Sequence, residues 1–429
     1  MNAADIGPIA AADRRQPAFD LFLIFACANI VATTFQTGAS LMPAFSLQSA
    51  LALVAIGSVS GSLLIALLSA VGPRLGVPSV IAARAALGVR GAGLVAVLLY
   101  ATNFAWIAVN NVIAASACAR MAGGPASERA WAVGLGLVST LVVAGGPRLV
   151  ARADRLAVPL LAVVGVLLTV ACFRLPSTVL WAPGTGGVSW LGGLDIVVGY
   201  QMSWVLMFAD YSRYTTGPRR ASVAVFLGLA LTSLWLMPLG AMAARAASSS
   251  DPGAMLQALD LGLSGAILMT VATVTTNFVN IYMSSLALRS LVPTASDQLT
   301  VWSTGLIAAA LSLFSGAWLD RYASFMLVLG GLLVPVGGIL VARFYLVRSP
   351  VRVDSLYDSS GEFARHGGID RAGLIAWAAG GATYYLASGI GGTIPALLAT
   401  IAVYLGLKRM AGFRGQGSGA GPSRATQWH

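Results

Sequence analysis

The sequence predicts an all-α polytopic membrane protein with twelve transmembrane helices. Hydrophobic residues make up 57% of the 429 residues and charged residues only 10%, whereas charged residues are about a quarter of a soluble globular domain. Apolar stretches near the roughly 20 residues that a spanning helix needs recur along the whole chain. The expected spans are 19–45, 49–71, 92–118, 130–146, 156–173, 193–212, 222–246, 256–288, 299–316, 322–346, 372–388 and 393–407.

The formal net charge of +11 follows from this topology. With a cytoplasmic N-terminus, only five of the 26 Lys and Arg residues fall outside: Arg120, Arg129, Arg174, Arg245 and Arg321. The positive-inside rule gives this asymmetry for twelve spans with both termini in the cytoplasm. Residues 1–18 lack the apolar core of a signal peptide and are predicted to be a cytoplasmic N-terminus. We therefore expect a multi-pass protein of the cell (inner) membrane, with no nucleic-acid partner.

Residues that usually carry metal or catalytic chemistry are sparse in the predicted spans. Cys27, Cys118 and Cys172 lie inside spans without CxxC or Cys/His spacing, which indicates small packing residues. His366 and His429 lie in a loop and the tail. An intramembrane enzyme would need a nucleophile with a base, or metal ligands, at depth. The sequence therefore predicts neither an enzyme, nor a resident metal, nor a cofactor.

The first predicted span is interrupted by the polar run from Thr33 to Gly38. Short polar side chains beside a glycine allow a discontinuous helix, whose backbone opens toward a cavity. Alternatively, the hydroxyls bond carbonyls of their own helix or of a neighbour. After the small-residue packing span 49–71, the segment 79–91 is expected to lie amphipathically at the cytoplasmic surface.

The third span places Asn103, Trp106 and Asn110 at i, i+3 and i+7, on one face of a helix. An indole beside two carboxamides at mid-membrane can stack on a flat ring and bond its edges. The alternative is a polar seam between helices, with Trp106 as filler.

The sixth span is the most unusual one, following two plain spans. Its Gly199 to Ser203 end is polar, and Asp210 lies three residues before Arg213 at its cytoplasmic end. An ionisable group within a span is a functional hypothesis by default. For Asp210 and Arg213 we favour a solvated ion pair or a helix-end latch, and we expect the backbone to open at the Gly199 end. The seventh span contains Pro238, a kink that neighbouring helices can tolerate.

The eighth span carries the second dense polar run, from Thr273 to Asn280. The adjacent hydroxyls of Thr275 and Thr276 can supply neutral oxygens to a hard cation such as Na⁺. Alternatively, both hydroxyls bond their own helix. The remaining spans are plain, apart from a glycine-rich hinge at 334–338.

The interrupted spans are the first and the sixth, and the polar-faced ones are the third and the eighth. Because five is an odd number of spans, the second copy of a five-span unit enters the membrane inverted, as in many secondary transporters. The expected units are a first repeat at 19–173, an inverted second repeat at 174–347, a cytoplasmic loop at 348–371, two further helices at 372–410 and a disordered tail at 411–429.

Over almost its whole length the chain resembles the nucleobase:cation symporters, most closely the cytosine permeases. The resemblance rests on Gly72-Pro-Arg-Leu-Gly76, Ala83-Arg-Ala-Ala-Leu-Gly-Val-Arg-Gly91, Trp106, Val197-Val-Gly199, Phe208-Ala-Asp-Tyr-Ser-Arg-Tyr214, Thr275-Thr-Asn277, Ile281-Tyr282 and Pro335-Val-Gly-Gly338. It implies a leucine-transporter-like fold of ten core helices plus two. It also implies import of a nucleobase or related heterocycle (cytosine, purine, hydantoin or pyrimidine thiamine-precursor type) with Na⁺ or H⁺, by alternating access.

The resemblance also implies the site. Trp106 would stack on the substrate ring, with Asn103, Asn110 and Asn277 at its edges. Residues of the sixth span would line the other side: Gly199, Tyr200, Gln201 and Ser203. The cation would be held by the hydroxyls of Thr275 and Thr276 and by carbonyls near Ala272 and in Cys27 to Ile30.

The chain departs from the cytosine permeases at two of these positions. Asn103 stands where they tend to have Gln, and Gln201 where they have an aromatic ring. This suggests a substrate with more polar edges than cytosine, or stacking by Tyr200 or Trp204 instead. Na⁺ is preferred over H⁺, because neither Thr275 nor Thr276 can carry a proton at physiological pH.

An amino-acid or amine carrier on the same fold is the alternative. A protonated amine would require a buried carboxylate as its counter-charge, and none lies beside Trp106 or Asn277 in the sequence. The expected partners are a small heterocycle and the lipid bilayer, with no evident obligate protein partner.

Overall fold

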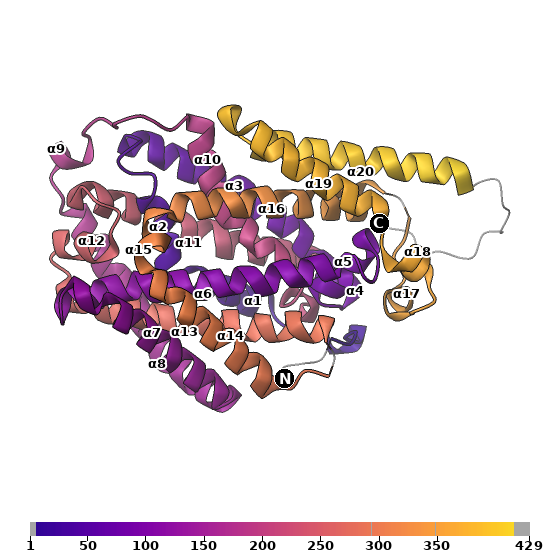
Figure 1. The fold of residues 1–429 in the computed structure, drawn as a ribbon, viewed down its shortest axis with the longest axis horizontal. Coiled ribbons are helices and arrows are strands. Elements are labelled where there is room, and N and C mark those ends of the chain that lie inside the picture. Colours follow the sequence, from indigo (N-terminus) through magenta and orange to yellow (C-terminus); the bar gives the residue numbers. More distant parts are fainter. Residues whose placement is uncertain (1–5, 293, 348, 416–429) are drawn as a thin grey trace.

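The computed structural model describes residues 6–292, 294–347 and 349–415, which fold into helices without a β-sheet (Figure 1). The long helices are α1 (Ala18–Asn29), α2 (Ala32–Ala39), α3 (Leu47–Ser69), α6 (Gly93–Met121), α7 (Glu128–Ala144), α8 (Pro147–Phe173), α10 (Trp190–Met202), α11 (Pro218–Ala247), α13 (Gly262–Leu291), α14 (Asp297–Leu311), α16 (Tyr322–Val341), α19 (Arg371–Leu386) and α20 (Thr393–Gly415). Shorter helical pieces connect them: α4 (Val71–Leu75), α5 (Ser79–Leu87), α9 (Ser177–Leu180), α12 (Pro252–Ala258), α15 (Ser315–Asp320), α17 (Val353–Tyr357), α18 (Arg365–Gly368) and the 3₁₀ segments η3 (Ser203–Met207) and η4 (Ser212–Tyr214).

Each of the twelve predicted spans coincides with one of these long helices or with an interrupted pair. In the part of the chain that the structure describes, six helices are long and apolar enough to cross a membrane, and the bent pair of α1 and α2 makes a seventh. Helices α7, α14 and α19 are shorter, at 17, 15 and 16 residues. The predicted tail begins too early, because α20 continues through Gly415; residues 416–429 lie outside the described residues.

The first span is discontinuous, as predicted, but its break lies earlier than expected. The axes of α1 and α2 are bent by 57°, and Val31 between them is extended, with φ −140° and ψ 161°. The polar run from Thr33 to Gly38 is itself helical. The break falls at Ile30 and Val31, next to Asn29, which is fully buried and donates a hydrogen bond to Thr232 of the neighbouring helix α11 (2.8 Å). A helix can be interrupted within a membrane where polar side chains of neighbouring helices satisfy the hydrogen-bonding groups that the interruption frees.

The sixth span also changes conformation, where α10 gives way to η3 at Ser203. This change falls at the last residue of the Gly199 to Ser203 stretch in which the backbone was expected to open, while Gly199 itself lies inside α10. A methyl group on Gly199 would lie 2.2 Å from the carbonyl oxygen of Met326 in α16. This glycine is therefore required for close helix packing, which small residues permit in membranes.

Helices α6 and α13 pack along each other at the centre of the bundle, and the two interrupted helices lie beside them (Figure 1). Helices α7, α8 and α14 cover one side of this core. Helices α19 and α20 pack side by side and contact the core through α16. The equivalent helices of the two predicted repeats thus lie together in the interior: the first span with the sixth, and the third span (α6) with the eighth (α13).

Asp195 of α10, an intramembrane acid that the sequence analysis did not single out, joins the outer helices to the core. It is 3% exposed, and its carboxylate accepts hydrogen bonds from the N–H groups of Gly392 (2.6 Å) and Thr393 (3.0 Å) at the start of α20. A carboxylate at this position accepts hydrogen bonds from N–H groups that have no partner within the helix, and its negative charge interacts favourably with the positive end of the helix dipole.

We expect Asp195→Asn to lower the free energy of unfolding by about 1.5–3 kcal/mol, because one accepting oxygen becomes a donor facing backbone N–H groups. Thermal unfolding of the purified protein, followed by tryptophan fluorescence, measures this. Asp320→Asn, at an exposed position, is the matched control and should leave the melting temperature unchanged. Equal melting temperatures for both variants would contradict the capping role.

Candidate functional site

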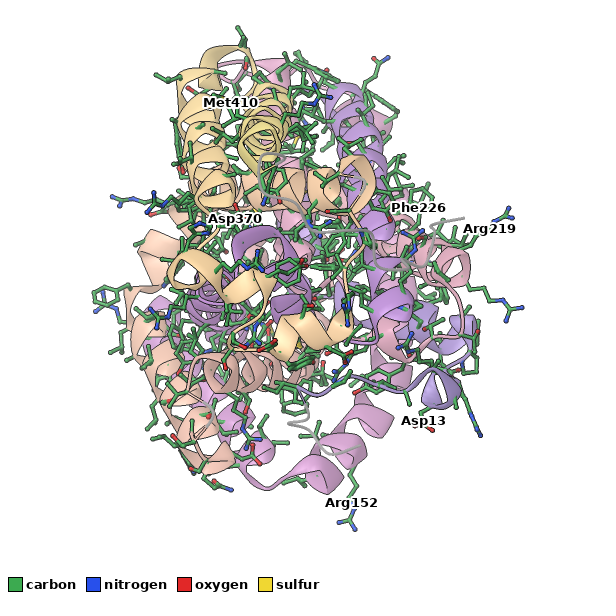
Figure 2. All side chains as sticks on the ribbon, turned by 90° about the vertical axis from the view of Figure 1, so that its right-hand side faces the viewer. Asp13, Arg152, Arg219, Phe226, Asp370 and Met410 are labelled. Atoms are coloured by element: carbon green, nitrogen blue, oxygen red, sulfur yellow. The ribbon has the colours of Figure 1, made fainter. Side chains whose placement is uncertain are left out.

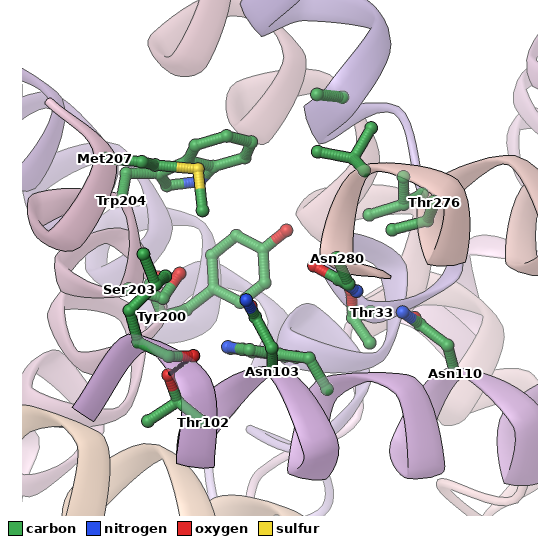
Figure 3. A pocket seen from close by; sticks show the side chains of 15 residues that line it. Thr33, Thr102, Asn103, Asn110, Tyr200, Ser203, Trp204, Met207, Thr276 and Asn280 are labelled. Carbon is green, nitrogen blue, oxygen red and sulfur yellow. Dashed lines mark hydrogen bonds between the residues drawn. The ribbon is translucent and has the colours of Figure 1, made fainter. Parts of the chain in front are cut away.

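A buried cavity of about 50 Å³ lies where the two interrupted helices meet α6 and α13 (Figure 3). Its walls come from the break between α1 and α2, from one face of α6, from the end of α10 with η3, and from α13. The lining residues are Ala28, Val31, Thr33, Leu99, Thr102, Asn103, Trp106, Asn110, Tyr200, Ser203, Trp204, Met207, Thr276, Val279 and Asn280.

The helix face predicted from the spacing of Asn103, Trp106 and Asn110 is turned toward this cavity. Tyr200 and Ser203 face it from the α10 side and Thr276 from α13 (Figure 3). Six of the residues expected at the site, from three different spans, are therefore brought together in one place. No charged side chain is among the described residues that line it.

Three buried polar atoms in the lining side chains have no hydrogen-bond partner within the described residues. They are Nδ2 of Asn103, Oδ1 of Asn110 and Nε1 of Trp204. Leaving a buried donor or acceptor unbonded costs about 1–3 kcal/mol. Two donors and one acceptor are thus available to a ligand with a polar edge.

The aromatic wall is built around Trp106, which is 8% exposed. Its ring makes edge contacts with Tyr200 (centroids 5.7 Å apart, 90° between planes) and with Phe325 of α16 (5.2 Å, 66°). The hydroxyl of Tyr200 donates to Oδ1 of Asn29 (3.0 Å) and also contacts Thr34. Tyr200 is therefore fixed to the break in the first span and holds Trp106 in turn.

Gly199, Gln201 and Asn277, which were expected at the substrate, lie outside the cavity lining. Nε2 of Gln201 donates to Ser233 of α11 (2.8 Å), and its side chain packs over Gly61 of α3. Gly199 and Gln201 flank Tyr200 in the sequence, but the helical turn directs them away from the cavity. Gly199 faces α16, and Gln201 faces α3 and α11.

Asn277 belongs instead to a polar seam between α6, α7 and α13. Its Nδ2 donates to Oδ1 of Asn111 (2.8 Å) and to Ser139 (3.3 Å), and its Oδ1 accepts from Asn110 (3.4 Å). Both alternatives for the third span are thus present on one helix: Asn103 and Trp106 face the cavity, and Asn111 faces the seam. Asn110 belongs to both.

The threonine pair on α13 bonds its own helix, as one of the two alternatives expected. Thr276 donates to the carbonyl of Ala272 (2.6 Å), and Thr275 donates to the carbonyls of Val271 (2.9 Å) and Ala272 (3.1 Å). A hydroxyl that donates its proton keeps oxygen lone pairs for another partner. Self-bonding is therefore compatible with a cation on the other side of the oxygen.

The break in the first span faces this part of α13. Thr276 shares the main cavity with Ala28 and Val31, and Ala272 shares a second cavity of about 20 Å³ with Ile30. Cys27 lies half-buried on the last turn of α1. Among the described residues no group of three or more His, Cys, Asp or Glu side chains could hold a metal ion.

Comparison with known proteins identifies the chain. The sequence profile of a family described as permeases for cytosine/purines, uracil, thiamine and allantoin matches residues 8–406. The chain belongs to this family. The permease is 25% identical over 374 residues to the putative purine-cytosine permease YxlA of Bacillus subtilis (82% of this chain and 81% of the relative). It is also 25% identical over 325 residues to the cytosine permease of Escherichia coli K12 (73% and 74%).

Solved structures show the same fold. Mhp1, a nucleobase-cation-symport-1 family transporter in a closed conformation with bromovinylhydantoin bound, has a TM-score of 0.78 and 18% identity, covering 95% of both chains. The inward-facing conformation of Mhp1 has a TM-score of 0.81 and 19% sequence identity, and the match covers 94% of the permease and 93% of Mhp1. MhsT in complex with L-phenylalanine has a TM-score of 0.55 and 15% sequence identity, and the match covers 90% of the permease and 97% of MhsT. The predicted fold class is confirmed. The permease is a membrane transporter of the family described for cytosine/purines, uracil, thiamine and allantoin, not an enzyme.

Asp210 and Arg213, which first drew attention in the sequence, lie beyond the cavity at the end of the sixth span of the permease. Both are buried, so the expectation of a solvated pair is wrong. Arg213 donates to the carbonyl of Gly7 (3.3 Å) and to the hydroxyl of Tyr214 (2.9 Å). The N-terminal segment lies over this helix end, which favours the latch alternative.

The sequence analysis did not single out two side chains that support the aromatic wall, those of Asn29 and Phe325. Asn29 is a buried amide one residue before the break, and its spacing from the polar run gave no periodic signal. Phe325 lies in α16 and contacts the Trp106 ring from outside the cavity lining, and in a largely apolar helix such a supporting ring cannot be told from any other packing ring.

Proposed function

We propose that the permease imports a neutral, planar nitrogen heterocycle, a nucleobase or a close relative such as a hydantoin or a pyrimidine thiamine precursor. The observation that carries this is the cavity beside Trp106. Within the described part of the chain, three of its buried polar atoms lack partners and none of its lining residues is charged. The edges of a heterocycle alternate donors and acceptors and can satisfy these atoms. An amine or carboxylate substrate would leave its charge without a counter-charge, which is costly in a buried site.

We further propose that uptake is coupled to a cation, with Na⁺ preferred over H⁺. Support comes from the α13 groups around the Ala272 carbonyl, to which Thr275 and Thr276 both donate. Thr276 shares one cavity with Ala28 at the end of α1, and Ala272 shares another with Ile30 at the break. Cys27 lies on the last turn of α1, one residue before Ala28. Neutral oxygens suit a hard cation and bind it weakly, as a coupling ion requires. Each charge moved inward releases about 2.3 kcal/mol per 100 mV of membrane potential.

Alternating access accounts for the small size of the cavity. A volume of about 50 Å³ is far below the ~300–1,000 Å³ of ordinary small-molecule pockets, so the substrate must enter when the helices are further apart. Tyr322, at the start of α16, donates to the carbonyl of Thr33 (2.9 Å) and contacts the hydroxyl of Thr37 (2.9 Å). These bonds hold α16 against α2 and must break when that side of the site opens.

The distribution of Lys and Arg supports an inner-membrane location with both termini in the cytoplasm. In this orientation the Tyr322 contact closes the outer side of the site, and the helix end with Asp210 and Arg213 faces the cytoplasm. Opening toward the outside therefore requires α16 to move away from α2.

The substrate class is tested by a thermal-shift screen of the purified protein. Pyrimidines, purines, hydantoins and thiamine precursors are each added with Na⁺ or with choline as the replacement cation. We expect a stabilising shift for one of these classes that is larger with Na⁺, because a ligand that binds only the folded state stabilises it. The same compound should then accumulate in proteoliposomes only under an imposed inward Na⁺ gradient.

Two results would contradict parts of this proposal. Stabilisation by amino acids or amines and by none of the heterocycles would exclude the proposed substrate class. Accumulation driven by a proton gradient and unaffected by Na⁺ would retain the substrate class and exclude the ion.

A further inference from the structure

A second and larger cavity lies far from the heterocycle site, at the end of the molecule that carries α17 and α18 (Figure 1). Its volume is about 600 Å³, within the ~300–1,000 Å³ range of small-molecule sites. Helix α5, the end of α16, the loop after it, and the ends of α19 and α20 enclose it. In Figure 2 this end faces the viewer, and Asp370 is labelled there.

The polar walls of this cavity are predominantly cationic. Arg343, Arg365, Arg371 and Lys408 line it, against the carboxylates of Glu362 and Asp370. His366 lies beside them.

The carboxylate of Asp370 is already engaged. One of its oxygens accepts from the N–H of Gly373 at the start of α19 (3.2 Å), and the other pairs with Lys408. Glu362 is thus left to face three arginines, and the cavity carries an excess of positive charge.

Arg343 is the member of this set whose position is hardest to explain without an anion. It is 4% exposed, and it donates to the carbonyls of Ala85 and Ser349, both at 2.9 Å. None of the ion pairs formed among the described residues includes it. The carboxylates that act on it electrostatically, Glu362 and Asp370, are shared with the other cations of the cavity. A buried charge that is incompletely compensated is unfavourable, and an anion in the cavity would neutralise it.

We propose that this cavity binds a phosphate-bearing anion, with Arg343, Arg365 and Arg371 as its ligands. Guanidinium groups present a planar fork of donors that matches phosphate oxygens. Phosphate could come from a lipid headgroup or from a soluble compound, and the chemistry of recognition is the same.

The surroundings of the cavity favour the lipid as the source. Ile375 of α19 and Leu407 of α20 belong to its apolar lining, and Ile375 is 51% exposed. A phospholipid could place its headgroup among the arginines and its acyl chains along these helices. Basic pockets between transmembrane helices on the cytoplasmic side are known to take anionic headgroups.

The test uses the full-length protein in a neutral detergent, titrated separately with dioleoylphosphatidylglycerol, dioleoylphosphatidylcholine and inorganic phosphate. The readout is the apparent Kd from the saturable shift in thermal stability. Wild type should respond to phosphatidylglycerol and not to phosphatidylcholine. The double variant Arg365→Gln with Arg371→Gln should bind about 30-fold more weakly. Each basic residue contributes about 1 kcal/mol, and the two together make about one and a half powers of ten in Kd.

Arg352→Gln is the matched control, because Arg352 is an exposed arginine of the same loop that does not line the cavity. It should retain the wild-type Kd. Arg343→Gln is examined as a third variant by the same titration, and its own melting temperature without lipid shows whether it folds.

A response to inorganic phosphate that the double variant loses would support the site and identify a soluble ligand as its source. The absence of a saturable response to either anion would overturn the proposal. So would an equal response in the double variant and in Arg352→Gln, which would indicate only general attraction to a basic surface.

Discussion

Trp106→Ala is expected to weaken substrate binding by about 1–3 kcal/mol, roughly 5- to 150-fold in Kd, the range found when stacking on a base is lost. The indole is a large aromatic surface in the cavity wall, and Tyr200 and Phe325 hold it by edge contacts. Its removal takes away the stacking partner and also leaves a space that the fixed Tyr200 ring cannot fill. Isothermal titration or substrate-induced stabilisation measures the Kd.

Trp106→Phe retains a ring on the same helix face and should lose less than half of the binding energy that Trp106→Ala loses. Trp302→Ala, at a partly exposed position on α14, controls for the general loss of a tryptophan and should bind as wild type does. Unchanged affinity in Trp106→Ala, in protein that elutes as a folded monodisperse species, would refute stacking by this residue.

The double variant Thr275→Ala with Thr276→Ala is expected to abolish the stimulation of uptake by Na⁺. Contacts to a charged partner contribute about 1.5–3 kcal/mol each, so losing both hydroxyls removes about 3 kcal/mol or more and should raise the half-saturating Na⁺ concentration at least about 150-fold. The helix itself should persist, because alanine has the higher helix propensity and the lost bonds run only to Val271 and Ala272. Uptake into proteoliposomes across a range of Na⁺ concentrations gives the measurement.

Thr270→Ala is the control for this variant, since Thr270 lies on the same helix and its hydroxyl contacts the sulfur of Cys118, away from the break. It should keep the wild-type Na⁺ dependence. If the double variant still responds to Na⁺ as wild type does, the cation site lies elsewhere. The outcome is independent of the Trp106 experiment, in which binding can be followed at saturating Na⁺.

The interior of the permease links the two proposed sites through one short network. Asn29 ends α1, accepts a hydrogen bond from Tyr200 and donates to Ser233 (2.8 Å). The ring of Tyr200 lies against Trp106, while the backbone just after Asn29 faces the α13 threonines. A change in the backbone at the break would therefore reach the aromatic wall, which is a physical route for the coupling free energy between ion and substrate that symport requires.

The face of α6 is the part of the site that was best predicted from the sequence. Residues at i, i+3 and i+7 share one side of any helix, so Asn103, Trp106 and Asn110 had to be neighbours wherever the helix lay. The sixth and eighth spans were harder to predict. Tyr200 and Gln201 are adjacent, and a rotation of one residue, about 100°, decides which of them meets the cavity.

The polar threonine and asparagine runs show a similar limit. The sequence marked the runs from Thr33 and from Thr273 as unusual for lipid-facing helices, but it could not assign each side chain to a partner. In the structure Asn277 bonds across to Asn111, and Thr276, its neighbour, faces the cavity. Asp195 is the clearest case, because an intramembrane acid that could have been a transport residue serves as the cap of α20.

The sequence by itself determined that this is a multi-span membrane protein with an inverted repeat, since hydropathy, the Lys and Arg distribution and the five-span spacing of polar helices depend only on local composition and order. Only the tertiary structure decided where the first and sixth spans break, which polar residues face the substrate, and which faces pack against α11 or α16. The physical reason is that the groups opposite a segment decide its conformation. Thr232 accepts a hydrogen bond from Asn29 at the break in the first span, and the Met326 carbonyl leaves no room for a side chain at position 199. Those groups lie far along the chain and are brought opposite one another only by the fold.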